Sequence, residues 1–349
     1  MSTISDTRDT SIRVPSDARA NAHFLGICLF FAGLALGLVV ACVPNPWMRL
    51  WTIGVAYVTG IGSIVLFLAC LEVIRQRHAS RSKGIDARSP LRRLTEIGIA
   101  FLALVTVVTS MTVFKTTIVG AAGYHWDLTF AAADRAIFGT DPWRISHAVF
   151  DQSWMTDVLD RLYHPLFMPM VLGYILCLVL PGHPALRRTY MGSYLVAWVL
   201  IGMALAWAFS SAGPVYEEIL WGDGTTYAAL VERLAAQEAE TRPLYALRAQ
   251  AYLLAAQQNG LSQFGGGISA MPSMHVVLAA LWAFAGWHLS RVLGAVLTVY
   301  TALIWVGSVH LGWNYAVDGI VSLAVLAAIW WSVGRLVGLY PIGPRTPPV

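Results

Sequence analysis

The chain has 349 residues, of which 57% are hydrophobic and only 12% are charged. Soluble domains carry about 25% charged residues, so this composition excludes an ordinary water-soluble enzyme. The net charge of +4 does not indicate a nucleic-acid partner, because the basic residues lie mainly beside the ends of apolar blocks, where they orient a membrane protein.

Eight apolar blocks without Asp, Glu, Lys or Arg divide the chain. Each can hold a helix of roughly 17 to 25 residues, the length needed to cross a hydrocarbon core about 30 Å thick. We therefore predict an all-α polytopic membrane protein with about eight transmembrane helices. The blocks are 20–48, 51–71, 97–114, 162–186, 189–216, 274–290, 292–317 and 319–334.

The charges around these blocks predict the orientation of the chain. Seven basic residues and one acid lie between Arg75 and Arg93, and short basic loops stay in the cytoplasm. With eight spans, both termini are then cytoplasmic. The compact loops carry no eukaryotic sorting signal, which favours a bacterial inner membrane whose opposite face is the periplasm.

The same topology predicts how the chain is divided. A six-helix membrane domain follows two additional helices, and two long segments face the extracytoplasmic side. An Ala-, Leu-, Gln- and Glu-rich stretch at 227–258 predicts one or two surface helices. The predicted parts are a cytoplasmic tail at 1–21, two helices with a basic loop at 22–93, the membrane domain at 94–338 with extracytoplasmic segments 115–161 and 212–272, and a second tail at 339–349.

The cysteines predict neither a disulfide framework nor a metal site. All four lie inside apolar blocks, without a CxxC pair or a histidine at ligand spacing. They are Cys28, Cys42, Cys70 and Cys177. We expect neither a disulfide framework nor a zinc site.

Polar residues at membrane depth are costly, so a group of them at one membrane level indicates function. On the extracytoplasmic side, Lys115 and the segments 210–214, 271–275 and 310–318 are expected at the same level. Four segments that are distant in sequence are therefore predicted to converge.

The segment Met271-Pro-Ser-Met-His275 begins the sixth block. Proline favours the first helical position, which leaves the amides of Ser273, Met274 and His275 as donors at a positive helix end that suits phosphate. The Ser273 hydroxyl adds a donor, and His275 can exchange a proton. The alternative is an ordinary helix start with an interfacial histidine.

The segment that ends at Asp318 is the second candidate. If the last helix begins near Trp313, Asn314 and Asp318 lie one turn apart on one face, within hydrogen-bonding reach. The alternative is an aromatic belt of Trp313 and Tyr315 at the membrane interface, with Asp318 capping the helix.

These two segments carry a family resemblance. Gly267-Ile-Ser-Ala-Met-Pro-Ser-Met-His275 and Leu311-Gly-Trp-Asn-Tyr-Ala-Val-Asp318 resemble the second and third signatures of the type 2 phosphatidic acid phosphatase superfamily. The form that these two signatures take in this chain resembles the inositol phosphorylceramide synthase-like (inositolphosphotransferase) branch of that superfamily. Further matches are Asp134–Trp143, Asp160–Tyr163 and Ser211–Pro214, so the resemblance covers roughly residues 115 to 320.

The resemblance implies a phosphohistidine mechanism without metal or cofactor. In that family a histidine, followed four residues later by an aspartate, attacks the phosphoryl group, and the histidine of Pro-Ser-x-His protonates the leaving oxygen. Carried over, His275 is the general acid and Asp318 the orienting carboxylate. The implied substrate contacts are Ser273, Met274, Lys115 and Tyr163.

The chain departs from the family pattern at the nucleophile. Asn314 occupies that position, and an amide has no basic lone pair with which to hold a phosphoryl group. Ser308 corresponds to a usual arginine, whose charge Arg135, Arg144 or Arg161 would have to supply. Three explanations of Asn314 stay open: a disabled enzyme, a native lipid-binding pseudoenzyme, or an enzyme in which His310 makes the attack.

Two expectations concern the first extracytoplasmic segment. His125, His147 and His164 are interpreted as membrane-interface residues. The stretch 134–143 predicts a short interfacial helix and a turn, with Gly139 and Asp141-Pro142 as turn residues.

The sequence thus predicts an integral-membrane hydrolase or transferase of lipid metabolism, acting on the extracytoplasmic face. Its expected partners are the bilayer and a phospholipid, sphingolipid or other lipid-phosphate substrate. Water as acceptor makes it a lipid phosphatase, and a lipid hydroxyl makes it a headgroup phosphotransferase. The alternative is a non-catalytic membrane scaffold that binds lipid phosphate.

Overall fold

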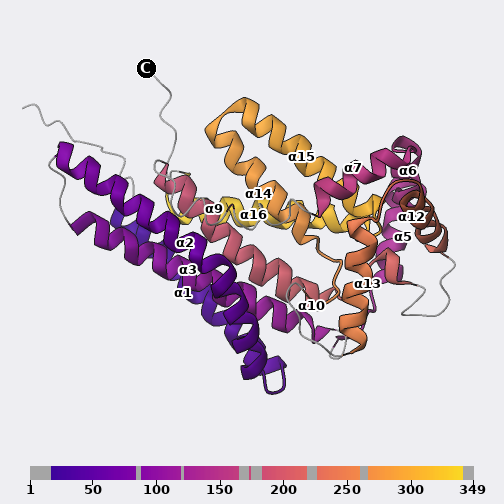
Figure 1. Cartoon of the computed structure of the whole chain (residues 1–349), viewed down its shortest axis with the longest axis horizontal. Coiled ribbons are helices and arrows are strands. Elements are labelled where there is room, and N and C mark those ends of the chain that lie inside the picture. Colours follow the sequence, from indigo (N-terminus) through magenta and orange to yellow (C-terminus); the bar gives the residue numbers. More distant parts are fainter. Residues whose placement is uncertain are drawn as a thin grey trace, which may run out of the picture.

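Helices form all the regular secondary structure in the part of the chain that the structure describes (Figure 1). The computed structural model describes residues 17–83, 88–118, 122–164, 173, 183–217, 226–259 and 266–340. The predicted all-α class is confirmed.

The first three helices lie side by side, with α3 packed against both others (Figure 1). Helices α1 (Asp17–Cys42), α2 (Trp47–Lys83) and α3 (Arg88–Lys115) are long. Helix α2 alone has 37 residues, about 55 Å at 1.5 Å per residue, so it extends well beyond a hydrocarbon core.

The basic stretch between Arg75 and Arg93 is not the loop that the sequence predicted. Helix α2 continues to Lys83 and α3 begins at Arg88, with 84–87 outside the described residues. Lysine and arginine are good helix formers. The basic residues that indicate the orientation of the chain therefore continue α2 and begin α3.

Helix α9 (Pro184–Val199) lies at the centre of the bundle, in contact with α1, α3, α14 and α16. Twelve of its 16 residues are buried. It continues through a π-helical turn, η1 (Leu200–Leu205), into α10 (Ala206–Ala208). Such turns widen a helix locally and often occur at functional sites.

The last three helices complete the bundle. They are α14 (Met274–Leu289), α15 (Arg291–His310) and α16 (Ala316–Leu336). Helices α14 and α15 form an antiparallel hairpin in which Ser290 caps α15 by accepting the Leu293 N–H at 3.1 Å. The helices lie so close that a Cβ on Gly286 would meet the Gly294 backbone at 3.3 Å.

The chain is an integral membrane protein. Five described helices are long and apolar enough to cross a membrane, and α14 is a shorter apolar helix. The predicted fourth span, 162–186, lies largely outside the described residues, so the count of eight stays a prediction. The five are Asp17–Cys42, Leu94–Lys115, Pro184–Ala208, Arg291–His310 and Ala316–Leu336.

Five amphipathic or polar helices, which we call the end layer, gather at one end of the bundle (Figure 1). They pack on α15 and α16 and on one another. The predicted turn at Gly139 is confirmed, with φ 75°, as are two surface helices within 227–258. The end layer comprises α5 (Asp127–Phe138), α6 (Pro142–Val149), α7 (Ser153–Tyr163), α12 (Ala228–Glu240) and α13 (Tyr245–Gln258).

Buried aspartates of the end layer hold chain segments that are distant in sequence. Asp127 accepts the backbone N–H groups of Ala212 and Gly213 at 3.1 and 2.9 Å, and the Ser211 and Tyr315 hydroxyls at 2.9 and 3.1 Å. Its carboxylate therefore fixes the segment after α10 against the turn before α16.

Asp134 does the same for α16. Its two oxygens accept the N–H groups of Ala316 and Val317 at 2.7 and 2.8 Å. The first amides of a helix lack partners within the helix, and a negative charge beside them is favourable. A carboxylate on α5 thus caps α16 from outside.

Replacing Asp134 with Ala removes this cap and leaves two buried N–H groups without a partner. We expect Asp134→Ala to lower the free energy of unfolding by about 1–3 kcal/mol, measured by denaturant unfolding in detergent. Asp151→Ala is the control, because Asp151 forms a surface ion pair with Arg233 and its side chain is 64% exposed, so less than about 1 kcal/mol is expected. Equal losses in the two variants would refute the role given to Asp134.

Candidate functional site

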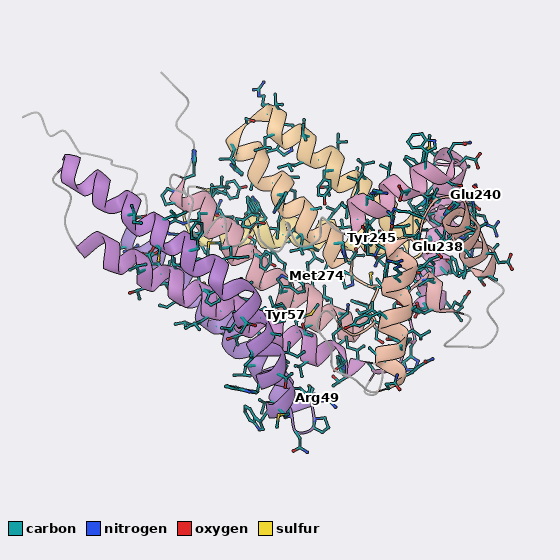
Figure 2. The ribbon with its side chains drawn as sticks, in the orientation of Figure 1. Arg49, Tyr57, Glu238, Glu240, Tyr245 and Met274 are labelled. Atoms are coloured by element: carbon teal, nitrogen blue, oxygen red, sulfur yellow. The ribbon has the colours of Figure 1, made fainter. Side chains whose placement is uncertain are left out.

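A cavity of about 360 Å³ lies where the bundle meets the end layer. Six of the residues singled out from the sequence line it together: Lys115, Tyr163, Ser273, Met274, His275 and Asn314. Figure 2 labels Met274, at the start of α14, and a further lining residue, Tyr57 on α2, near the middle of the molecule. The predicted convergence of distant segments on one place is therefore present.

Lys115 is the last residue of α3 and brings a cation to the cavity. No described carboxylate forms an ion pair with its ammonium group. A cation at a helix C-terminus is favourable, but its charge in a cavity still needs a counterion. The cavity is thus suited to an anion.

The glycine run before α14 passes directly over Lys115. Gly267 has φ +87°, and a Cβ there would lie 2.9 Å from Lys115 Cγ and 3.0 Å from its backbone carbon. Only glycine combines this backbone conformation with so close an approach. The Gly265-Gly266-Gly267 sequence, which signals a flexible segment, thus also has a packing function at its last residue.

Helix α14 begins two residues later than the sequence predicted. Pro272 was expected at the first helical position, whereas the helix begins at Met274 and Ser273 is its extended N-cap residue, with ψ 106°. Ala270, three residues before Ser273, donates its backbone N–H to the Ser211 carbonyl at 2.9 Å, which holds the chain outside the helix at this point. The α14 N-terminus still lies at the cavity, where first-turn amides suit an anion.

Asn314 joins the two motifs. Its Oδ1 accepts a hydrogen bond from the Ser273 hydroxyl at 3.3 Å, and its Nδ2 donates to the Ala270 carbonyl at 2.6 Å and to Asp318 Oδ2 at 3.2 Å. The expected contact between Asn314 and Asp318 is present, although Asn314 precedes α16 instead of lying on it.

Asp318 also caps its own helix. Besides Asn314, its Oδ2 accepts the backbone N–H of Tyr315 at 3.0 Å. Asp318 is fully buried and does not line the cavity, and it contacts the lining residue Asn314. The capping interpretation and the pairing interpretation of Asp318 therefore both hold.

His275 lies against an aromatic side chain of the end layer. Its ring stacks on Tyr163 of α7, with centroids 4.2 Å apart and planes at 16°. Tyr163 is 2% exposed and lines the cavity. The resemblance of Asp160–Tyr163 to the family pattern is thus explained by the contact between Tyr163 and His275, which orients the His275 ring.

The structure does not bring His310 to the cavity. Its ring is fully buried between Thr156, 2.8 Å from Nε2, and Ser146, 3.3 Å from Nδ1, and it stacks on His147 at 3.7 Å. Both ring nitrogens are engaged. The geometry contradicts the alternative in which His310 replaces the missing nucleophile.

The candidate arginines also lie elsewhere. Arg135 and Arg144 both pair with Asp141, at 3.0 and 3.5 Å, and Arg161 pairs with Asp157 at 2.9 Å. None of these arginines lines the cavity. They do not bring to the cavity the positive charge of the arginine that the family usually has at the position of Ser308.

The sequence interpretation missed His164, which was assigned to the membrane interface. His164 lines the cavity, and its Nδ1 lies 3.1 Å from Oδ1 of the buried Asp160. Burial raises the pKa of Asp160, but His164 and two backbone N–H groups lower the pKa more, so it lies below its usual value. The spacing of Asp160 and His164, one helical turn, was the signal available in the sequence.

The rest of the cavity is largely apolar and extends into the bundle. Val108 precedes Lys115 by seven residues on α3, which corresponds to about 10 Å along the helix axis. Gly202 and Ala206, in and after the π-helical turn, line the α9 side. A polar end and an apolar interior suit an amphipathic ligand.

These features define an integral membrane protein with a lysine-containing cavity where its helical bundle meets the end layer. The family model of the PAP2 superfamily matches residues 128–332, which is more than half of the chain. The chain therefore belongs to the PAP2 superfamily, whose members act on lipid phosphates. The match begins in α5, so Lys115 lies before it. No curated protein and no solved structure matches the chain.

Lys115→Gln is expected to weaken binding of a short-chain phosphatidic acid by at least about tenfold, because the cavity loses its unpaired ammonium group. Titration calorimetry in detergent measures the dissociation constant. Arg161→Gln is the control, because this substitution removes a positive charge that lies outside the cavity. Equal affinities of the two variants would contradict the assignment of Lys115.

Gly267→Ala tests the same contact without changing any charge. The added methyl group must displace Lys115 and strain a positive φ, so we expect weaker phosphatidic acid binding, again by about tenfold. Gly139→Ala is the control, because Gly139 also has a positive φ but no atom lies near its Cβ position. Unchanged binding by Gly267→Ala would show that Lys115 does not need this placement.

Proposed function

We propose that the chain is an integral-membrane enzyme that cleaves or transfers the phosphate group of a lipid phosphate or phospholipid. One observation carries the proposal: Lys115, Ser273, His275 and Asn314 line one cavity whose remaining lining is largely apolar. A phosphate headgroup fits the cation and the helix N-terminus, and an acyl chain fits the apolar part.

The proposed reaction takes place on the extracytoplasmic side. Arg187 and Arg188 at the start of α9, Arg291 at the start of α15 and Arg335 at the end of α16 all lie at the helix ends opposite those that approach the cavity. Basic residues favour the cytoplasmic side. In a bacterial inner membrane the cavity would then open to the periplasmic leaflet.

Each group at the polar end has a proposed role. Lys115, Ser273 and the first amides of α14 bind the phosphoryl oxygens and stabilise the charge that develops on them. His275, held against Tyr163, donates a proton to the leaving oxygen. Asp318 holds Asn314, and Asn314 positions Ser273.

The acceptor decides between phosphatase and phosphotransferase. Water as acceptor releases inorganic phosphate, whereas a lipid hydroxyl yields a new phospholipid. The likeness of the two signatures to the inositol phosphorylceramide synthase-like branch favours transfer of a phospho-headgroup to a lipid hydroxyl, such as that of a sphingolipid.

A second candidate function is non-catalytic binding of lipid phosphate. The observation that favours it is the hydrogen bonding of Asn314, whose donors and acceptor are all engaged by Ser273, Ala270 and Asp318. The surroundings of Asn314 thus satisfy an amide side chain at the position where the family has its nucleophilic histidine. Binding needs only the cation, the helix N-terminus and the apolar interior.

The two functions are distinguished by assaying the protein, His275→Gln and Asn314→His on labelled phosphatidic acid and phospholipids in mixed micelles, with and without a lipid-alcohol acceptor. We expect turnover by the unchanged protein and a loss of about 100-fold or more in His275→Gln, as for removal of a general acid. Turnover only in Asn314→His would identify a disabled enzyme. Binding of phosphatidic acid without turnover by any variant would refute the enzyme and support the scaffold.

A further inference from the structure

The Asp160–His164 pair is held in place by the end layer. Asp160 is fully buried, and its oxygens accept the N–H groups of Tyr245 and Ala246 at 2.7 and 2.9 Å, at the start of α13. Arg242 adds a contact to the same carboxylate at 3.3 Å. The position of the carboxylate is therefore fixed independently of His164.

This carboxylate in turn orients the His164 ring. Asp160 Oδ1 lies 3.1 Å from His164 Nδ1, and a carboxylate at one ring nitrogen selects the tautomer that carries its proton there. Nε2 then has a basic lone pair. The rings of Tyr163 and Trp313, with centroids 4.9 and 5.4 Å from that of His164, pack against the imidazole.

Both nitrogens of the His164 ring are buried. Nδ1 lies 3.1 Å from Asp160 Oδ1, but neither Nδ1 nor Nε2 makes a regular hydrogen bond with the described residues, although the side chain is only 15% exposed. An unpartnered buried nitrogen is costly unless a ligand or water satisfies it. Because His164 lines the cavity, a ligand bound there is a candidate partner for Nε2.

His164 shares the cavity with the other groups proposed for phosphate chemistry. His164, His275 and Lys115 all line this cavity. The cavity therefore contains a carboxylate-oriented histidine, a second histidine and a lysine. A nucleophile of this kind is what Asn314 cannot supply.

We propose that His164, oriented by Asp160, is the nucleophile that attacks the lipid phosphate and forms a phosphohistidine. The inference rests on the proposed function and names the residue that performs its first step. It explains how a chain with Asn314 in the family's nucleophile position retains activity, by a nucleophile on α7 instead of the turn before α16.

The reaction then has two balanced steps. In the first, the Nε2 lone pair forms a bond to phosphorus, the bond from phosphorus to the leaving oxygen breaks, and His275 gives that oxygen a proton. In the second, the oxygen of water or of a lipid hydroxyl attacks phosphorus and its proton passes to His275. The bond between Nε2 and phosphorus breaks, which restores both histidines.

The first test locates the phosphoryl group in the unchanged protein. After brief reaction with phosphatidic acid labelled on phosphorus, the protein is denatured at alkaline pH, where phosphohistidine survives, and digested with trypsin. Cleavage after Arg161 and Arg187 gives a peptide of residues 162–187, and we expect the label there. Label in the peptide 249–291, with His275, or 292–335, with His310, would overturn the proposal.

The second test uses substitutions. We expect His164→Gln to lose turnover and label by at least about 1,000-fold while it still binds phosphatidic acid, and His125→Gln, at an exposed histidine outside the cavity, to retain both. Adding Asn314→His to His164→Gln supplies a second nucleophile beside Asp318 and should raise turnover at least about tenfold. Turnover by His164→Gln within about tenfold of the unchanged protein would overturn the assignment.

These outcomes separate the two levels of the proposal. Activity that survives in His164→Gln overturns the nucleophile and leaves the proposed function intact. Absence of turnover from the unchanged protein and from both Asn314→His proteins, with phosphatidic acid still bound, overturns the proposed function and the nucleophile with it.

Discussion

The site depends on carboxylates that are buried in the end layer and hydrogen-bonded to backbone amides of distant segments. A buried carboxylate is costly unless its oxygens are satisfied, so Asp127, Asp134 and Asp160 each require a particular segment to be in place. The segments they hold are the chain after α10, the start of α16 and the start of α13. These are the walls of the cavity or their direct neighbours. The cavity is therefore assembled with polar contacts from the end layer, which the apolar side chains of the bundle helices do not supply.

This arrangement couples structural and chemical roles in single residues. Asp160 secures α13 and orients His164, and Tyr163, beside it on α7, stacks on His275. One short helix thus contributes to the placement of both histidines in the cavity. The end layer accordingly behaves as part of the site and not as a connection between membrane helices, and a shift of α7 would alter both rings together.

Sequence patterns predicted most of the fold because membrane thickness sets helix length. The sixth block, 274–290, became α14 at Met274–Leu289 for this reason. The same patterns predicted that Lys115 and His275 lie at one membrane level, and both line one cavity. They failed where contacts cross between elements. His310 is close to Asp318 in sequence, yet it faces α6 and α7, whereas His164 is 111 residues before His275 and reaches the same cavity. No local spacing encodes such contacts.

The hydrogen bonds of Asn314 explain why the nucleophile would move instead of the site being lost. The amide donates to the Ala270 carbonyl and to Asp318 at once, and it accepts from Ser273. A neutral histidine has one donor and one acceptor, so it could satisfy Asp318 only by leaving the Ala270 carbonyl without a partner. In this chain Asn314 therefore secures the turn before α16 to the segment before α14. Asn314, which holds these two segments together, is better suited to shaping a phosphate-binding site than to attacking phosphorus. In the proposed mechanism His164, beside Asp160, makes that attack.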